Sequence, residues 1–185
     1  YTSSEGFRHL NDPMREALSR TSSTRERYPR HPLPVTMGFI SDGIRKLRLH
    51  YEREGGRNSA GGGAHSEELI LYRGLHNMTL DNEFMSNLAG GTELAISSST
   101  TSFEVATTFM LHTADGLPKL PSDVLLLRLV VRNATRFGGA VGYLSVNPAE
   151  CEVLYPPLTF LEPTGNYQVE TIGSTRLTVI EVVPI

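Results

Sequence analysis

The chain has 185 residues, 39% of them hydrophobic, which is enough for one domain of ordinary size with a proper core. Its 17 basic and 20 acidic residues give a formal charge of -3, so the chain has no overall positive field and nucleic acid is not an expected partner. A single cysteine excludes an internal disulfide framework, and we expect no metal site because neither CxxC nor HExxH spacing occurs.

The first third of the chain is predicted to be helical. Apolar residues recur every three or four positions between residues 7 and 18, which predicts a short amphipathic helix followed by a proline-containing loop. A second helix is predicted over 36–52, and glycine-rich residues 55–66 predict a flexible joint. The apolar stripes are Phe7, Leu10, Met14 and Leu18 in the first helix and Phe39, Ile40, Ile44, Leu47 and Tyr51 in the second.

Two strands and two short helices are predicted between residues 68 and 111, after the joint. Residues 68–74 form a compact apolar strand, 79–88 have helical spacing, and Gly90-Gly91 makes a turn. Residues 92–102 then predict one strand with a cluster of hydroxyl groups. The helix expected next, Phe103 to Leu111, would turn Val105, Ala106 and Phe109 inward.

The last third is predicted to be β-rich. Residues 124–131 are the most apolar run and predict a central strand, and shorter strands are expected at 151–155, 167–172 and 176–183. Helices followed by strands, without βαβ alternation, are typical of an α+β domain with a helical lobe packed on antiparallel or mixed sheets. We therefore expect residues 1–65 to form the helical lobe and joint, and 66–185 the β-rich core of one structural domain.

Three polar features stand at the ends of predicted apolar strands. They are Arg73, the hydroxyl cluster 97–101, and the pair Glu150 and Glu152. Alternate residues of a strand point the same way, so the two carboxylates are expected side by side on one face, where crowding raises the pKa of at least one of them. Taken singly, Arg73 also fits a surface ion pair, the hydroxyl cluster an ordinary edge strand, and the two glutamates a pair of solvated charges.

Several classes of site are excluded or not expected. The sequence holds no GxxxxGK[ST] motif, and Gly61-Gly62-Gly63 lies in a polar stretch and not between a strand and a helix, as a dinucleotide fingerprint requires. No run approaches the roughly 18 apolar residues of a membrane helix, and the N-terminal residues lack a signal peptide's hydrophobic segment. We therefore expect no membrane-spanning segment and leave localisation open.

The order of these features resembles the Arg-Ser-Glu class of mono-ADP-ribosyltransferases, which includes arginine-modifying toxins, effectors and ectoenzymes. YRGL (72–75) looks like the first strand of that family, and GGTELAISSSTTSFEVATTF (90–109) is similar to its Ser-Thr-rich block. GGAVGYLSVNPAECEVLYPPLTFL (138–161) is similar to its segment with an E-x-E motif, so the likeness covers roughly 68–171. The resemblance implies an N-terminal helical lobe packed on a two-sheet, largely antiparallel β-sandwich. It also implies that NAD is the substrate and that the reaction needs no metal.

The resemblance also implies roles at the NAD site. Glu152 would bond the nicotinamide-ribose 2′-hydroxyl, Arg73 would neutralise the diphosphate, and the backbone of Gly74 would bond the nicotinamide carboxamide. Ser99 would hold Glu152, flanked by Ser98 and Thr100, although the serine motif fits equally with Ser98 in the leading position. Phe109 is the nominated aromatic wall of the nicotinamide pocket, with Phe103 as the alternative.

The acceptor side of the site follows from the same resemblance. Glu150 would take a protein arginine, and residues 138–149 would form the recognition loop, with Tyr143 and Asn147 as acceptor contacts. Tyr143 is either an exposed aromatic or a core residue. Open alternatives are a threonine acceptor, for example on ubiquitin, NAD hydrolysis, and a non-catalytic NAD or ADP-ribose binding module. A monomer is expected, and a bacterial effector acting in the host cytosol is one localisation that the resemblance allows.

Overall fold

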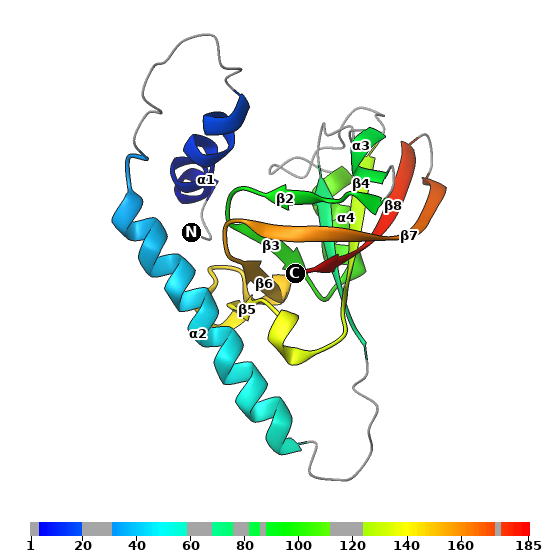
Figure 1. The fold of residues 1–185 in the computed structure, drawn as a ribbon. Coiled ribbons are helices and arrows are strands. Elements are labelled where there is room, and N and C mark those ends of the chain that lie inside the picture. The colour runs from blue at the N-terminus through cyan, green and yellow to red at the C-terminus, as the bar shows by residue number, and fades with distance from the viewer. Residues whose placement is uncertain are drawn as a thin grey trace.

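The computed structural model describes residues 4–19, 31–58, 68–75, 82–85, 88–111, 124–172 and 175–185. Two helices, α1 (Ser4–Ser19) and α2 (Pro34–Asn58), precede a β-rich part, and they lie on one side of it in Figure 1. Helix α4 (Phe103–Leu111) packs on strands β1 (Leu69–Leu75) and β4 (Val124–Val131). Within the described ranges, no helix is both long and apolar enough to cross a membrane.

Both predicted N-terminal helices are confirmed, with one change of length and one change of face. α2 continues through Gly55 and Gly56 to Asn58, beyond the predicted end at 52, and the rest of the predicted joint lies outside the described residues. Its buried face holds Met37 and Ile44, whereas Phe39 is 73% exposed. Met37 lies one and two turns before Ile40 and Ile44, so the stripe continues through position 37 and leaves Phe39 on the solvent side.

Eight strands form a sheet in the order β2-β7-β8-β4-β1-β3-β6-β5. Every pair is antiparallel except β4 with β8, which confirms a largely antiparallel α+β fold with β4 in the middle. β7 begins eight residues before the strand predicted at 167. The remaining strands are β2 (Gly91–Glu93), β3 (Ser97–Thr100), β5 (Gly139–Ala140), β6 (Glu152–Tyr155), β7 (Thr159–Ile172) and β8 (Thr175–Pro184).

One junction holds the two parts of the sheet together. β1 and β3 share a single residue pair, Tyr72 with Thr100, whereas β1 pairs with β4 along its whole length. In place of two separate sheets, the described strands therefore form one sheet with a narrow seam between β1 and β3. The seam matters because polar side chains gather beside it.

The strand predicted over 92–102 is two strands. Leu94, Ala95 and Ile96 leave the sheet, so β2 pairs with β7 at one edge while β3 pairs with β1 and β6. Ile96 is fully buried against the N-terminal helices, and its carbonyl accepts a hydrogen bond of 2.9 Å from Nδ2 of Asn11. Burial of this apolar residue therefore breaks the strand and brings α1 against the seam.

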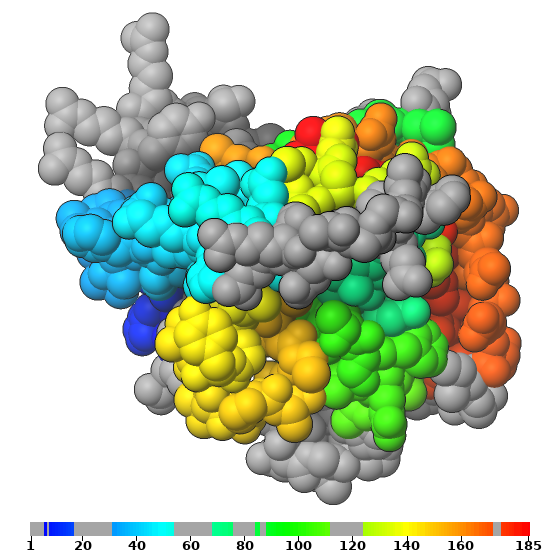
Figure 2. Space-filling model, turned by 90° about the horizontal axis from the view of Figure 1, so that it is seen from below, coloured from blue at the N-terminus to red at the C-terminus, as the bar shows by residue number. Residues whose placement is uncertain are grey.

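Two apolar clusters cover the two faces of the sheet beside the seam. On the α4 side, Ala106 and Met110 pack with strand residues. On the other side, α1 and α2 contribute Leu10, Met37 and Ile44, which pack with Ile96, Val141 and Leu154. In Figure 2 the residues near 140–150 (yellow) and those of α4 (green) meet on one face of the molecule.

The helix predicted over 79–88 is described only as α3 (Asn82–Met85), and Gly90 makes the expected turn with a φ of 67°.

Candidate active site

Glu152 is the first residue of β6 and is only 9% exposed. The Ser98 hydroxyl donates a 2.7 Å hydrogen bond to its Oε1. Burial raises the pKa of this carboxyl above its ordinary value of 4.5, the bond from Ser98 opposes that shift, and the nearby Glu150 adds to it. Glu152 is therefore a carboxylate held in one direction in surroundings that disfavour its charge.

The structure distinguishes the two serines that the sequence left open. Ser98 of β3 and Glu152 of the neighbouring β6 point to the same face of the sheet, and Ser98 bonds Glu152. Ser99 is 4% exposed and donates to the carbonyl of Val153 at 3.0 Å. Because successive strand residues point to opposite faces, only one of the two can reach the carboxylate. Ser98 contacts Glu152, and the prediction of Ser99 in that position is wrong.

Arg73 of β1 reaches across the seam to β3. Its Nη1 donates to the carbonyl of Ser98 at 2.9 Å, and its Nη2 lies 3.0 Å from Oε2 of Glu93. Its side chain is 11% exposed. Ser98 therefore contacts both predicted residues, Arg73 through its carbonyl and Glu152 through its hydroxyl, so these two charged groups share one site.

Two charged residues at this site were missed by the sequence analysis. Glu93 closes β2, and its Oε1 lies 3.3 Å from Nη2 of Arg15 on α1. Arg15 follows Asn11 by one helical turn, and Asn11 is fully buried. The sequence did carry a signal for this contact. Asn11 and Arg15 lie four positions apart, each directly after a residue of the apolar stripe, so they share one side of the helix next to its buried face.

Glu150 is close to Glu152 but does not share a strand with it. It ends a short 3-10 helix, η4 (Pro148–Glu150), and Cys151 then adopts a left-handed conformation with φ 47° and ψ 45°. The expectation of two carboxylates on one face of one strand is therefore wrong, because a residue in this conformation redirects the chain between them. Glu150 is exposed, and its carboxylate accepts a 3.1 Å hydrogen bond from the Asn147 amide. Its backbone carbonyl accepts a 2.6 Å hydrogen bond from the Thr100 hydroxyl.

The predicted aromatic contacts are partly different from expectation. Phe109 is 67% exposed, so its prediction as an inward residue of α4 is wrong; Ala106 and Met110 take the buried face. Phe103 makes an edge contact with Tyr72 at a ring separation of 5.4 Å. Tyr143 lies in a second 3-10 helix, η3 (Gly142–Leu144), and is 72% exposed, which decides for the exposed aromatic.

Close packing against α4 requires a glycine at position 74, which the sequence did not indicate. A Cβ at this position would lie 2.3 Å from Cγ of Met110 and 2.9 Å from the carbonyl oxygen of Ala106. α4 therefore approaches β1 over the bare backbone of Gly74. Whether that backbone also contacts a ligand remains a prediction.

Substitution Gly74→Ala is expected to lower the free energy of unfolding by about 1–3 kcal/mol, because the added methyl group overpacks the contact with α4. Chemical denaturation of both proteins measures the difference. Gly38→Ala in α2 is the matched control: its Cβ meets nothing within 4 Å, so it should raise stability by about 0.5–1 kcal/mol. Equal stability of Gly74→Ala and the unsubstituted chain would contradict the packing argument.

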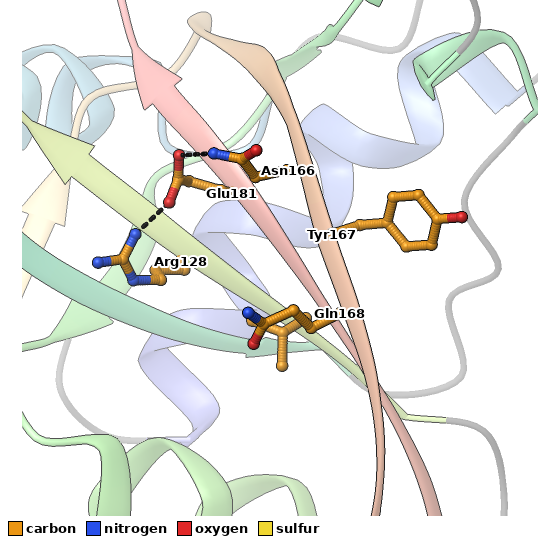
Figure 3. Close-up of a pocket in the computed structure, with 6 residues that line it drawn as sticks. Arg128, Asn166, Tyr167, Gln168 and Glu181 are labelled. Atoms are coloured by element: carbon orange, nitrogen blue, oxygen red, sulfur yellow. Dashed lines mark hydrogen bonds and ion pairs between the residues drawn. The ribbon is translucent and has the colours of Figure 1, made fainter.

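A separate pocket of about 340 Å³ lies over β4, β7 and β8 (Figure 3). Arg128 and Glu181 form an ion pair in it, and Asn166 donates to Glu181 at 2.9 Å. Tyr167 points away from this pair in Figure 3. None of the site residues above lines this pocket, whose charges already neutralise each other, so we assign no binding role to it.

Comparisons with known proteins identify the fold. No family model matches the chain, and no curated relative does. Among solved structures, the ADP-ribosyltransferase HopU1 of Pseudomonas syringae pv. Tomato DC3000 matches with a TM-score of 0.56 at 14% identity over 95% of this chain. Plx2a, an ADP-ribosyltransferase toxin from Paenibacillus larvae, matches with 0.53 at 16% identity over 99% of this chain and 87% of its own.

A third structure, the ADP-ribosylating toxin BECa of a binary enterotoxin of C. perfringens with NADH, matches with a TM-score of 0.52 at 15% identity over 100% of this chain. The chain spans 64% of the HopU1 chain and 44% of the BECa chain. These likenesses show that the chain has the ADP-ribosyltransferase fold.

Proposed function

We propose that the chain is an NAD-dependent mono-ADP-ribosyltransferase of the Arg-Ser-Glu class, which transfers ADP-ribose from NAD to a protein side chain and releases nicotinamide. Arginine is the favoured acceptor. The observation that carries this proposal is the arrangement around Ser98, whose hydroxyl holds buried Glu152 and whose carbonyl holds Arg73. The ADP-ribosyltransferase fold supports it independently.

Cleavage of the nicotinamide-ribose bond gives Glu152 its chemical role. The bonding electrons leave with the nicotinamide nitrogen, and positive charge develops on the ribose, as in glycoside hydrolysis. A carboxylate fixed beside the sugar stabilises that charge more than it stabilises the neutral sugar, which lowers the barrier. Ser98 keeps the carboxylate pointed at the sugar, so no reorganisation is needed during the reaction.

The diphosphate of NAD would lie against Arg73, with Arg15 beside it. A guanidinium is planar and always charged, and its donor fork suits phosphate oxygens. Arg73 reaches this position because it is anchored by Ser98, and Arg15 because α1 is docked through Asn11. Residues from α1, β1 and β3 together would therefore bind one NAD molecule.

Transfer needs a second group beside the reacting carbon. A guanidinium nitrogen of the acceptor forms the new bond to C1 of the ribose and loses one proton, and a carboxylate next to it can orient the guanidinium and accept that proton. Glu150 is exposed and near Glu152, which suits this role. Tyr143 and Asn147 on the same segment would contact the acceptor protein.

The two serines give a test of the site within one strand. Ser98→Ala is expected to slow NAD cleavage by about 10-fold, because Glu152 loses the hydrogen bond that orients it. Ser99→Ala should leave the rate within about twofold and lower stability by about 1 kcal/mol, since it removes only the bond to Val153. Nicotinamide release and thermal unfolding measure the two effects, and a greater loss of rate in Ser99→Ala would reverse the assignment.

The biological setting is proposed by analogy. Plx2a and BECa are described as toxins, and this chain shares their fold at low identity. We therefore propose a toxin or effector that modifies a protein of another organism.

The proposal is tested by incubating the purified chain with NAD and a cell lysate. Liquid chromatography would measure nicotinamide release, and mass spectrometry open to all residue types would locate ADP-ribose on protein. Modified arginine supports the proposal in full. Modified threonine, for example on ubiquitin, or free ADP-ribose alone would change the acceptor and keep the NAD chemistry. Binding of NAD without nicotinamide release would mean a binding module and would refute the enzymatic assignment.

A further inference from the structure

Glu93 lies between two arginines that are far apart in the sequence, Arg15 and Arg73. Its Oε1 is 3.3 Å from Nη2 of Arg15 in α1, and its Oε2 is 3.0 Å from Nη2 of Arg73 in β1. One carboxylate therefore bridges a residue of the N-terminal helices and a residue of the central sheet. Neither the E-x-E motif nor the serine cluster includes it.

The backbone of Glu93 is fixed from both sides. Glu93 pairs with Thr159 of β7, and its carbonyl accepts a 2.8 Å hydrogen bond from the amide of Leu158. Three residues later, the carbonyl of Ile96 is bonded by Asn11. The segment that carries Glu93 is thus anchored to the sheet and to α1, and its side chain has little freedom to move away.

Burial makes the charge of Glu93 important. Its side chain is 16% exposed and that of Arg73 is 11% exposed, so water screens the charges of these two residues only weakly. Two guanidinium groups placed side by side would repel each other, and a carboxylate between them offsets this repulsion. The side chain of Arg15 is 36% exposed, so the contact with Glu93 restrains a group that would otherwise sample more of the solvent.

We propose that Glu93 is a positioning residue of the diphosphate site, which holds Arg15 and Arg73 at the separation that two neighbouring phosphate groups require. This inference rests on the proposed function, because it assumes that the two arginines meet the diphosphate of NAD. Each oxygen of Glu93 contacts one terminal nitrogen of one guanidinium, and each guanidinium carries five N–H donors. The carboxylate presets the pair, which lowers the entropy cost of ordering two long side chains on binding.

Glu93 is therefore expected to act on binding and not on bond cleavage. Glu93→Gln keeps the shape of the side chain and removes the charge that holds both arginines. We expect the KM for NAD to rise by about 10-fold while kcat stays within about threefold, because Glu93 pairs with the two arginines whereas Glu152 is oriented by Ser98. Calorimetric binding of ADP-ribose, which retains the diphosphate, should weaken by about the same factor, whereas inhibition by nicotinamide, which lacks it, should not change.

Glu181→Gln is the matched control. Glu181 is 17% exposed and paired with Arg128, so its loss breaks an ion pair of similar burial at a pocket that holds none of the site residues. It should lower the melting temperature as Glu93→Gln does and leave the KM for NAD unchanged. If Glu93→Gln does not fold, Glu93→Asp replaces it: the charge is kept, the shorter side chain cannot bridge both arginines, and the same rise in KM is expected.

Three outcomes would overturn the inference. An unchanged KM in the folded Glu93 variant would mean that Glu93 only stabilises the fold and does not position the arginines for NAD. An equal rise in Glu181→Gln would mean that lost stability, and not lost positioning, weakens binding. A lower KM in Glu93→Gln would mean that the carboxylate competes with the diphosphate. If the unsubstituted chain binds neither NAD nor ADP-ribose, the proposed function itself fails, which is a different result from any of these.

Discussion

Glu152→Gln is expected to lower the rate of nicotinamide release from NAD by about 10²–10³-fold, the range found when a preorganised group is removed from a developing charge. Gln has the same shape, and its carbonyl oxygen can still accept the bond from Ser98, so the variant removes the negative charge and little else. Saturating NAD and chromatographic detection of nicotinamide give kcat directly. The KM for NAD should change far less than kcat, because the lost interaction belongs to the transition state.

The same substitution should leave the protein at least as stable at neutral pH. The pKa of Glu152 is raised in the folded state, mainly by burial, so its charged form is disfavoured there. Because the folded pKa of Glu152 lies above its unfolded pKa, protonation of this carboxyl favours the folded state. That stabilisation is complete below the unfolded pKa and is lost as the pH rises through the folded pKa. At pH 7 the unsubstituted protein carries this cost and Glu152→Gln does not. A variant that is inactive because it is unfolded would show the opposite change in melting temperature.

The raised pKa also sets the acid side of the pH profile. Nicotinamide release requires the carboxylate form, so the rate should fall as pH drops through a pKa above the ordinary value of 4.5. The residual activity of Glu152→Gln should not show this fall in rate at acid pH. Equal rates in the unsubstituted chain and Glu152→Gln would remove Glu152 from the reaction and with it the proposed mechanism.

The parts of the fold that were predictable have strong local patterns. β4 is apolar at seven of its eight positions, so its place in the middle of the sheet follows from composition alone. Leu10 and Met14 of α1 and Ile40 and Ile44 of α2 keep helical spacing, so both helices were expected. Glu152 and Arg73 also stand at the ends of apolar strands, where a sequence can signal a site without any knowledge of long-range contacts.

What could not be predicted depends on contacts between distant segments. The Leu, Ile and Thr residues between 92 and 102 favour a single strand, and the burial of Ile96 against α1 and α2 divides the stretch into two. That division places Glu93 next to Arg73, so the charged bridge to Arg15 had no local signal. The left-handed conformation of Cys151 was equally hidden, because a residue other than glycine seldom adopts it.

This conformation separates the work of the two glutamates, and the separation leads to the second large effect. Glu150→Ala is expected to lower transfer of ADP-ribose to agmatine, a small guanidino acceptor, by about 10²-fold, the lower end of the range for a missing general base. Hydrolysis of NAD to free ADP-ribose should stay within about fivefold, because water needs no guanidinium orientation. Glu152 and Ser98 remain in place, since neither bonds the Glu150 side chain in the described structure.

Both products can be measured in one reaction by separating ADP-ribosyl-agmatine from ADP-ribose. Glu162→Gln removes an exposed carboxylate from β7, outside the segment 138–152, and should leave the ratio of transfer to hydrolysis unchanged. A parallel loss of both activities in Glu150→Ala would contradict the division of labour, and so would an unchanged ratio.

Glu150→Ala should also move the pH profile of the remaining hydrolysis. The negative charge of Glu150 contributes to raising the pKa of Glu152, after the larger effect of burial. Without that charge the pKa of Glu152 falls, so the acid limb of the rate profile should shift to lower pH. An unchanged acid limb would mean that the left-handed turn at Cys151 holds the two carboxylates too far apart to interact, and that Glu150 acts on the acceptor alone. A shift to higher pH would contradict the repulsion between the two carboxylates.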